Sequence, residues 1–254
     1  MKKILLVIIC IVVSGCAGLT GSESVEVEKR VRTLGVLPLL VDSGSIEYSN
    51  RDGLVALLEE SGQDVDDWLV EQLRKKGDYF DVRLIEGENS QLFEQIVSNR
   101  TVTGEGLTRH SLYSLNPEGV TRLINDNLVD AVLVVIVHGV KRPEKRWSEY
   151  GSGLEYMETE YRSLLYTASV VAAQNETLWL RNAPPGSYFL RIDYPDFMEA
   201  FWNVTDEVHV KEITLPGLQR RLAEPENGIF VKTAISKKYN TMVEELVREL
   251  KKGM

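Results

Sequence analysis

The chain begins with an unbroken apolar run from Ile4 to Val13, preceded by Lys2 and Lys3. This run is too short to cross a bilayer as a helix, which takes about 20 residues. A basic start, an apolar run and then small residues are the order of a secretory signal peptide. We therefore expect residues 1–15 to be a signal peptide that is removed from the mature protein.

After residue 30 the hydrophobic pattern changes repeatedly between the period of a strand and that of a helix. Apolar or alternating runs predict strands at Val31–Val41, Tyr79–Ile85, Ala131–Val137, Ser163–Ala173, Thr177–Leu180 and near Tyr188–Tyr194. Helical spacing predicts helices from Asp64 to Lys76, after Ser90, after Asn116 and over Gly228–Lys252. Residues 174–176 read as the turn of a hairpin.

Side chains near the expected helix ends fix several further expectations. Acids at the start of the 64–76 helix, bases at its end and Gly77 just beyond complement the helix dipole and the left-handed cap. We expect Phe80 to face the core with its strand neighbours, Val97 to continue the helix after Ser90, and Leu128 to face inward. The segment 183–227 is divided by prolines and glycines, and we expect an irregular insertion there.

The order of these elements is strand, helix, strand, helices, strand, hairpin and helix. This order predicts an α/β or α+β fold, in which helices pack on a mixed β-sheet and a long helix ends the chain. We expect residues 31–254 to form a single domain. The small, polar and charged residues before it, 16–30, are expected to be a flexible tether.

The four residues Val13-Ser14-Gly15-Cys16 resemble the lipobox of bacterial lipoproteins. That resemblance implies cleavage between Gly15 and Cys16 and lipidation of Cys16, which would become an acylated N-terminus. Ala17 follows, whereas an aspartate at this position in enterobacterial lipoproteins favours the inner membrane. The resemblance therefore implies an outer-membrane protein, lipid-anchored on the periplasmic face.

Composition narrows the classes of partner. Loss of two lysines with the signal peptide would change the formal net charge from −9 to −11, and an acidic chain repels nucleic acid. Cys10 would leave with the signal peptide and Cys16 would be alkylated. We therefore expect no disulfide, no thiolate metal site and no cysteine nucleophile.

Several segments together carry a resemblance to a known group of proteins. They are the lipobox, Leu34–Pro38, Leu73–Gly77, Val129–Val134, Asn175–Trp179 and the final helix. In this pattern the chain resembles the periplasmic α/β lipoproteins related to the curli-secretion channel, the N-terminal domain of the Tol–Pal translocation protein and the penicillin-binding-protein activator. The channel members of that group insert weakly charged, amphipathic hairpins into the outer membrane. Residues 141–160 are instead densely charged and do not alternate with apolar residues, so we expect no pore from them.

The candidate chemistry is sparse. His110, His138 and His209 are isolated in sequence and match no metal-ligand spacing, and the sequence holds no nucleophile elbow, phosphate loop or dinucleotide fingerprint. We therefore expect no cofactor, no metal and no catalytic residue. His138, at the end of a buried strand, reads most simply as a structural histidine.

One segment is unusual for a plain connection. Residues 147–161 combine Trp147, Tyr150, Tyr156 and Tyr161 with glutamates and a Gly-Ser-Gly stretch, and aromatic residues are enriched at protein interfaces. We expect a partner-binding loop here; a solvated connection whose aromatics fold back on the core is the other interpretation. The first functional hypothesis is a non-enzymatic accessory, assembly or secretion-related factor that binds an envelope protein or itself. The alternative is an envelope hydrolase with a site around His138 or His110, and the second alternative is an oligomeric secretion component.

Overall fold

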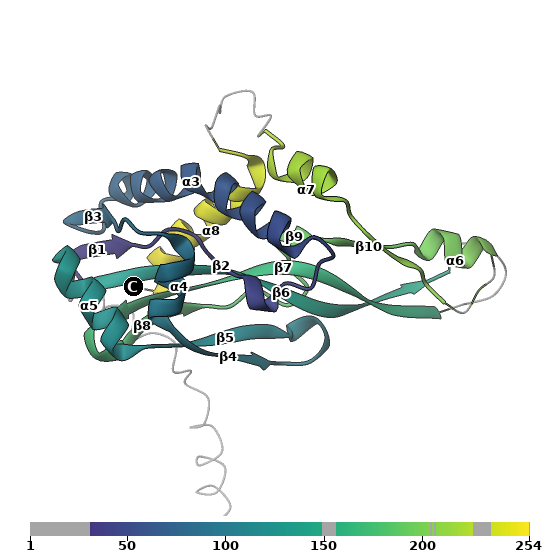
Figure 1. Ribbon diagram of the computed structural model, residues 1–254, viewed down its shortest axis with the longest axis horizontal. Helices are drawn as coiled ribbons and strands as arrows, with labels where there is room; N and C mark the ends of the chain where they lie inside the picture. Colours follow the sequence, from purple (N-terminus) through teal and green to yellow (C-terminus); the bar gives the residue numbers. More distant parts are fainter. Residues whose placement is uncertain (1–30, 149–155, 204, 206, 226–234, 254) are drawn as a thin grey trace, which may run out of the picture.

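The computed structural model describes residues 31–148, 156–203, 205, 207–225 and 235–253 (Figure 1). The expected signal peptide, Cys16, the tether and Tyr150 lie outside these residues. Within them the fold is mixed α/β, as the sequence predicts. No helix of the described residues is long and apolar enough to cross a membrane.

A seven-stranded sheet forms the centre of the described structure. Its main path runs in the order β3-β1-β6-β7-β8, with β2 also paired to β6 and β9 to β7. The strands β1, β2 and β3 run parallel to their neighbours, whereas β7 is antiparallel to β6, β8 and β9. The bounds are β1 (Thr33–Val36), β2 (Leu40–Asp42), β3 (Asp81–Leu84), β6 (Ala131–Trp147), β7 (Tyr156–Ala172), β8 (Thr177–Arg181) and β9 (Leu190–Arg191).

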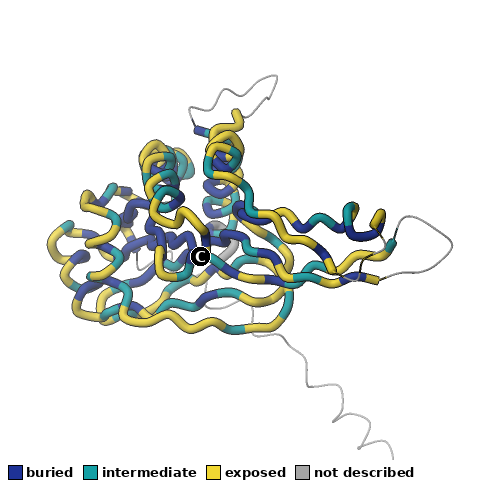
Figure 2. Tube along the Cα trace, turned by 45° about the vertical axis from the view of Figure 1, so that its right-hand side comes forward, coloured by how far each residue is buried: buried dark blue, intermediate teal, exposed yellow. Residues whose placement is uncertain are grey.

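Helices cover both faces of this sheet (Figures 1 and 2). One face packs against α3 (Arg51–Lys76), α7 (Leu215–Leu222) and α8 (Lys237–Gly253) in the larger hydrophobic core. The other face packs against α4 (Asn89–Ile96) and α5 (Pro117–Asn127) in a second core. Because helices cover both faces of the sheet, the first half of β6 is buried. This explains why its sequence is continuously apolar there.

Two smaller pairs of strands flank the main sheet. The hairpin of β4 (Val97–Thr103) and β5 (His110–Leu115) lies below β6 and β7 in Figure 1. The strands β10 (Asp193–Pro195) and β11 (Val210–Glu212) pair with each other on either side of α6 (Phe197–Asn203). Short 3₁₀ turns occupy Ser43–Ser45, Gly106–Thr108 and Ala173–Asn175.

The long hairpin of β6 and β7 gives the molecule its extended shape. Each strand has 17 residues, paired from Ala131 and Ala172 at one end to Trp147 and Tyr156 at the other. At a rise of about 3.4 Å per residue, such a strand spans about 55 Å. Its second half projects beyond the helices, together with α6 (Figure 1). We call this projection the arm, formed by residues 141–147, 156–161, 193–203, 205 and 207–212.

The helix predicted from Asp64 begins at Arg51 instead. Asn50 caps it by accepting a hydrogen bond from the Gly53 N–H, and Gly77 ends it with a φ of 76°, as expected for a left-handed cap. Its first half buries only widely spaced residues such as Leu54 and Leu58, so the sequence shows a weak stripe there. The prediction placed the start too late because acids inside the helix resemble a first turn.

Two burial expectations and the expected bounds of one helix are wrong. Phe80 is 83% exposed, with the Arg32 guanidinium 5.4 Å from its ring centroid. Leu128 is also largely exposed, because it ends α5 with a positive φ of 50° that turns it outward. Ser90 lies inside α4 while Glu88 holds the cap position, and Val97 starts β4 rather than continuing the helix.

Two regions are more ordered than the sequence suggested. The segment between α4 and α5 is the β4–β5 hairpin, whose sequence shows little alternation because no residue of β4 is buried and only two of β5 are. The segment 183–227, expected to be irregular, contains β9, β10, α6, β11 and α7. The final helix starts at Lys237 rather than at Gly228, and residues 226–234 are outside the described structure.

Candidate functional site

The arm carries the clearest group of exposed aromatic side chains. Trp147 and Tyr156 face each other across the β6–β7 pair, with ring centroids 5.1 Å apart. Trp202 and Met198 belong to α6, and Tyr194 belongs to β10. Between 43% and 78% of each of these five residues is exposed. We call these five residues the aromatic tip.

The sequence of α6 explains why its aromatic residues divide between two faces. Phe197, Ala200 and Phe201 recur at helical spacing and pack with Met157 of β7 and Val208 in a small separate core. Residues 198 and 202 fall on the opposite face of the same helix and point to solvent. The arm therefore has its own core, which holds α6 rigidly while presenting one face outward.

The charged residues of the arm are largely paired with one another. Across the hairpin, Lys141 lies 3.0 Å from Glu160, and Lys145 lies 3.1 Å from Glu158. The Lys211 ammonium contacts both Asp196 and Glu199. The pKa of the Asp196 carboxyl is lowered by the hydrogen bond from the Glu199 N–H and by the contact with Lys211. Exposed pairs of this kind each stabilise the fold by about 1 kcal/mol or less. Their effect here is to neutralise the arm's charge locally and leave the aromatic tip as its distinctive feature.

A buried arginine fixes the base of the arm. Arg142 of β6 is fully buried and donates to the backbone carbonyl of Arg109 from Nε and Nη2, at 3.1 and 2.9 Å. Its Nη1 donates to the carbonyl of Ser187 at 2.5 Å. Burial lowers the pKa of this guanidinium. Two connecting segments are thus tied to β6 at the point where the arm leaves the helices.

The predicted partner-binding loop over 147–161 is corrected in part. Trp147 and Tyr156 lie on paired strands, because cross-strand charge pairs support a hairpin here. Tyr161 is 3% exposed and packs under the Arg191 guanidinium, so it belongs to the arm's interior rather than its surface. Tyr150 lies outside the described residues. The sequence interpretation missed Trp202, although the apolar spacing of Phe197, Ala200 and Phe201 could have identified α6 and its outer face.

His138 lies at the centre of a buried polar cluster rather than in an open site. It is 0% exposed and pairs with Asp42 across β2 and β6. The Asp42 carboxylate accepts hydrogen bonds from the Tyr113 hydroxyl at 2.7 Å and from Arg100 at 3.3 Å. Burial lowers the pKa of His138 to about 4, so its imidazole is neutral at neutral pH. Neither ring nitrogen has a hydrogen-bond partner with good geometry among the described residues.

The three histidines do not converge. His110 contacts the Thr108 carbonyl through Nδ1 at 2.7 Å, and His209 is largely exposed on the arm, 3.8 Å from Glu199. In the described part of the chain, no group of three or more His, Cys, Asp or Glu side chains is placed to hold a metal ion. His110 is half-buried and His209 is exposed, so neither is enclosed as His138 is.

An acidic hollow lies where the parallel strands β1 and β3 end, the position at which open α/β sheets usually bind ligands. Its carboxylates come from Glu59, Asp66, Glu86 and Glu88. Burial raises the pKa of Asp66 to about 7, even though its Oδ1 accepts the Leu39 N–H at 2.8 Å. Burial and the nearby Glu88 also raise the pKa of Glu59. The hollow therefore disfavours anions, and Asp66 binds a proton readily.

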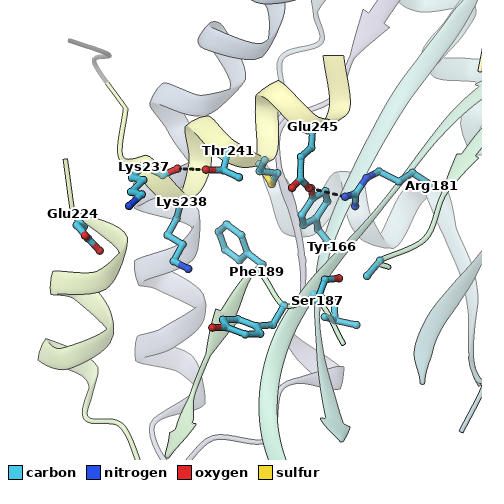
Figure 3. A pocket seen from close by; sticks show the side chains of 13 residues that line it. Tyr166, Arg181, Ser187, Phe189, Glu224, Lys237, Lys238, Thr241 and Glu245 are labelled. Atoms are coloured by element: carbon cyan, nitrogen blue, oxygen red, sulfur yellow. Dashed lines mark hydrogen bonds and ion pairs between the residues drawn. The ribbon is translucent and has the colours of Figure 1, made fainter. Parts of the chain in front are cut away.

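A cavity of about 210 Å³ lies between β7, the end of β8 and α8 (Figure 3). The buried Arg181 stacks over the Tyr166 ring at 4.2 Å and pairs with Glu245 and Glu249 of α8, at 2.7 and 2.8 Å. The Tyr166 hydroxyl donates to Glu245 at 2.6 Å, and burial raises its pKa. Because a single arginine of β8 holds two carboxylates of α8, the arrangement serves to fasten α8 to the sheet.

No protein-family model matches the chain. None of the curated proteins matches its sequence either. The residues and their geometry therefore carry the functional argument.

Proposed function

We propose that this protein is a non-enzymatic, lipid-anchored lipoprotein of the outer membrane, which binds an envelope protein on the periplasmic side through its aromatic tip. The observation that carries the proposal is the exposure of Trp147 and Tyr156 on the far part of the long β6–β7 hairpin, and of Trp202 on α6, which packs on this part of the hairpin. The lipobox-like segment Val13–Cys16 supports the lipid anchor. The resemblance of the chain to periplasmic α/β lipoproteins supports the proposed compartment.

The chemistry of the tip favours a protein partner. Tryptophan and tyrosine are enriched at the energetically dominant positions of protein interfaces, where they fill pockets of the partner. The surrounding charges are already paired within the arm, so a partner gains mainly from burying the aromatic rings. Trp147 and Tyr156 lose little conformational entropy when a partner binds, because their rings already contact each other and the backbone of both strands is held by continuous pairing.

The arm also suits a protein that is fixed to a membrane. Its paired strands extend away from the helical layers, so a partner can be reached at a distance from the main sheet (Figure 1). By contrast, His138, one of the two histidines of the hydrolase hypothesis, is buried and neutral, and a general base must reach the proton that it abstracts. His110, the other, is half-buried and bonds to the Thr108 carbonyl. Accessory binding is therefore the function that the geometry supports best.

The anchor is tested by Cys16→Ser. The substitution removes the thiol that would be acylated, and we expect an unprocessed precursor that takes up no labelled fatty acid. Processing is followed by the shift in mass of the protein, and attachment by fractionation of membranes. Cys10→Ser, which changes the other cysteine of the chain, is expected to mature normally. Normal maturation of the Cys16→Ser protein would disprove lipidation at this residue.

The tip is tested by the double variant Trp147→Ala/Trp202→Ala. Truncating one interface aromatic commonly costs about 2 kcal/mol of binding, roughly a thirtyfold loss of affinity, so we expect the pair to abolish crosslinks to the partner. The measurement is chemical crosslinking in the intact envelope followed by mass spectrometry. Anchoring and thermal stability should stay unchanged, since both side chains are exposed.

Two control variants make this test specific. Phe80→Ala removes an exposed aromatic residue that lies directly before the edge strand β3, away from the arm, and it should keep every crosslink. His138→Ala separates binding from catalysis, because only a hydrolase needs the imidazole. If a folded His138→Ala protein loses its cellular phenotype while the tip variant behaves like wild type, the binding proposal is wrong.

A further inference from the structure

The strands β3, β1 and β6 run parallel and start level with one another, at the end of the sheet that lies away from the arm (Figure 1). We call this end the starting edge, formed by residues 31–33, 80–83 and 127–131. Among the described residues, it carries the two most exposed large apolar side chains outside the aromatic tip. Phe80, directly before β3, is 83% exposed, and Leu128, shortly before β6, is 78% exposed. Since adjacent strands lie about 4.8 Å apart, β3 and β6 are separated by about 10 Å on either side of β1.

Hydrogen bonds hold the backbone of both exposed residues in place. The Phe80 N–H donates to the carbonyl of Arg32 at 2.9 Å, and Arg83 of β3 donates from Nη1 to the carbonyl of Leu128 at 3.2 Å. Leu128 ends α5 with a φ of 50°, at a position where glycine or asparagine is usual. Neither Phe80 nor Leu128 belongs to a hydrophobic core of the described structure. The fold therefore fixes both side chains outward.

The charges of the starting edge balance one another, although the whole chain has a formal net charge of −9. Its bases are Arg32 and Arg83, and its acids are Asp81 and Asp130. Arg83 pairs with Asp81 at 2.7 Å, and the Asp130 carboxylate accepts the Arg32 N–H at 2.8 Å. Anionic lipid headgroups repel an acidic protein surface, whereas an edge with balanced charges can approach them.

The chain reaches this edge directly from the expected anchor. Val31 is the first described residue, and residues 16–30 connect it with Cys16. At no more than about 3.6 Å for each residue, this connection reaches at most about 54 Å. The far ends of β6 and β7 lie about 55 Å from the starting edge, so the aromatic tip would meet the same lipid surface only if the connection were fully extended. The anchor therefore brings the starting edge, and not the tip, to the lipid.

We infer that the starting edge is a membrane-contact surface, which rests on phospholipid with Phe80 and Leu128 inserted among the headgroups. This inference rests on the lipid anchor of the proposed function. Apolar side chains of peripheral proteins are buried about 5–10 Å into the boundary between headgroups and acyl chains. Two such side chains bind a bilayer weakly by themselves, but the anchor gives them a high effective concentration beside it. The contact sets the orientation of the protein and directs the aromatic tip away from the membrane.

The test uses the acylated mature protein in vesicles of phosphatidylethanolamine and phosphatidylglycerol. Because Cys16 carries the lipid, Phe80→Cys and Leu128→Cys each supply a single free thiol for a nitroxide spin label. Power saturation of the EPR signal compares collisions of the label with oxygen, which concentrates in lipid, and with a water-soluble nickel complex. We expect both labels at a depth of about 5–10 Å in the headgroup boundary. Trp202→Cys is the matched control, since residue 202 is as exposed as residue 128, and its label should remain in water.

A second substitution tests whether the two side chains act together. Adding Phe80→Ser to the labelled Leu128→Cys protein removes one inserted group, and it should raise collisions with the nickel complex by at least about twofold, because binding follows the buried apolar area. Leu107→Ser is the control: this residue is 49% exposed and lies outside the starting edge, so the depth of the label should not change. Circular dichroism melts should show unchanged folding of both proteins. The Trp147→Ala/Trp202→Ala substitutions should also leave the depth unchanged, which separates this test from the aromatic tip.

The results that overturn the inference differ from those that overturn the anchor. Mass spectrometry of the purified protein shows whether Cys16 carries acyl chains, and their absence overturns the anchor and this inference with it. In an acylated protein, the inference alone is overturned if the labels at 80 and 128 meet the nickel complex as often as the label at 202. Dipolar broadening between labels at position 128 would also overturn it, because a second copy of the chain would then occupy this edge.

Discussion

Replacing Leu246 with alanine is expected to lower the free energy of unfolding by about 2–5 kcal/mol, the range for leucine truncation in a packed core. Leu246 is 0% exposed and lies on α8 in the larger core, together with Tyr239, Met242 and Val243. The alanine would leave a cavity between α8 and the rest of this core. Urea unfolding, followed by circular dichroism at neutral pH, measures the loss.

The matched control lies two residues further along the same helix. Arg248 is exposed, and Arg248→Ala keeps a residue of high helix propensity, so its unfolding free energy should remain within about 0.5 kcal/mol of wild type. A Leu246→Ala protein as stable as wild type would contradict the packing of α8 on the sheet. It would also contradict our interpretation that the ion pairs of Arg181 with Glu245 and Glu249 fasten α8 to the sheet.

The sequence predicts those parts of the fold in which local and tertiary signals agree. The helix α5 begins after Asn116 with Pro117 in its first turn, and the Asn116 side chain accepts the N–H groups of Glu118 and Gly119 as the spacing indicates. The apolar run from Ala131 marks a strand that is buried on both faces. In each case the same residues satisfy the local rule and the core.

Other elements depend on contacts that a single sequence does not show. The first half of α3 is held by a few buried residues, including Leu54, which pack against distant parts of the core. The hairpin β4–β5 has few buried side chains and is defined by its pairing. Past Val140, β6 continues through its backbone pairing with β7, and the exposed ion pairs across this part of the hairpin add little to it. Their charge pattern alone resembles that of a solvated connection.

The candidate surfaces divide in the same way. Trp147 and Tyr156 could be identified because aromatic residues stand out among charges. Trp202 joins them only because α6 folds back onto the arm through Phe197 and Met157.

Acidification from pH 7.5 to pH 4 is expected to lower the stability of the wild-type protein relative to that of a His138→Leu variant by about 3 kcal/mol. Burial lowers the pKa of His138 to about 4 in the folded state, whereas an unfolded histidine titrates near 6.5. Above pH 6.5 neither state binds the proton. Between 6.5 and 4 the unfolded state binds it and the folded state does not, so stability falls. Below pH 4 both states are protonated and the loss is complete.

The comparison with the leucine variant is needed because another buried group acts in the opposite direction. Burial raises the pKa of Asp66 to about 7, so the folded state binds that proton first and gains stability as the pH falls from 7. Both proteins contain Asp66, and its contribution cancels in their difference. Urea unfolding of each protein across this pH range gives that difference directly. His209→Leu, which alters a largely exposed histidine, should follow the wild-type profile. Parallel profiles for wild type and His138→Leu would show that the proton reaches His138 without unfolding, and would reopen the hypothesis of a catalytic imidazole.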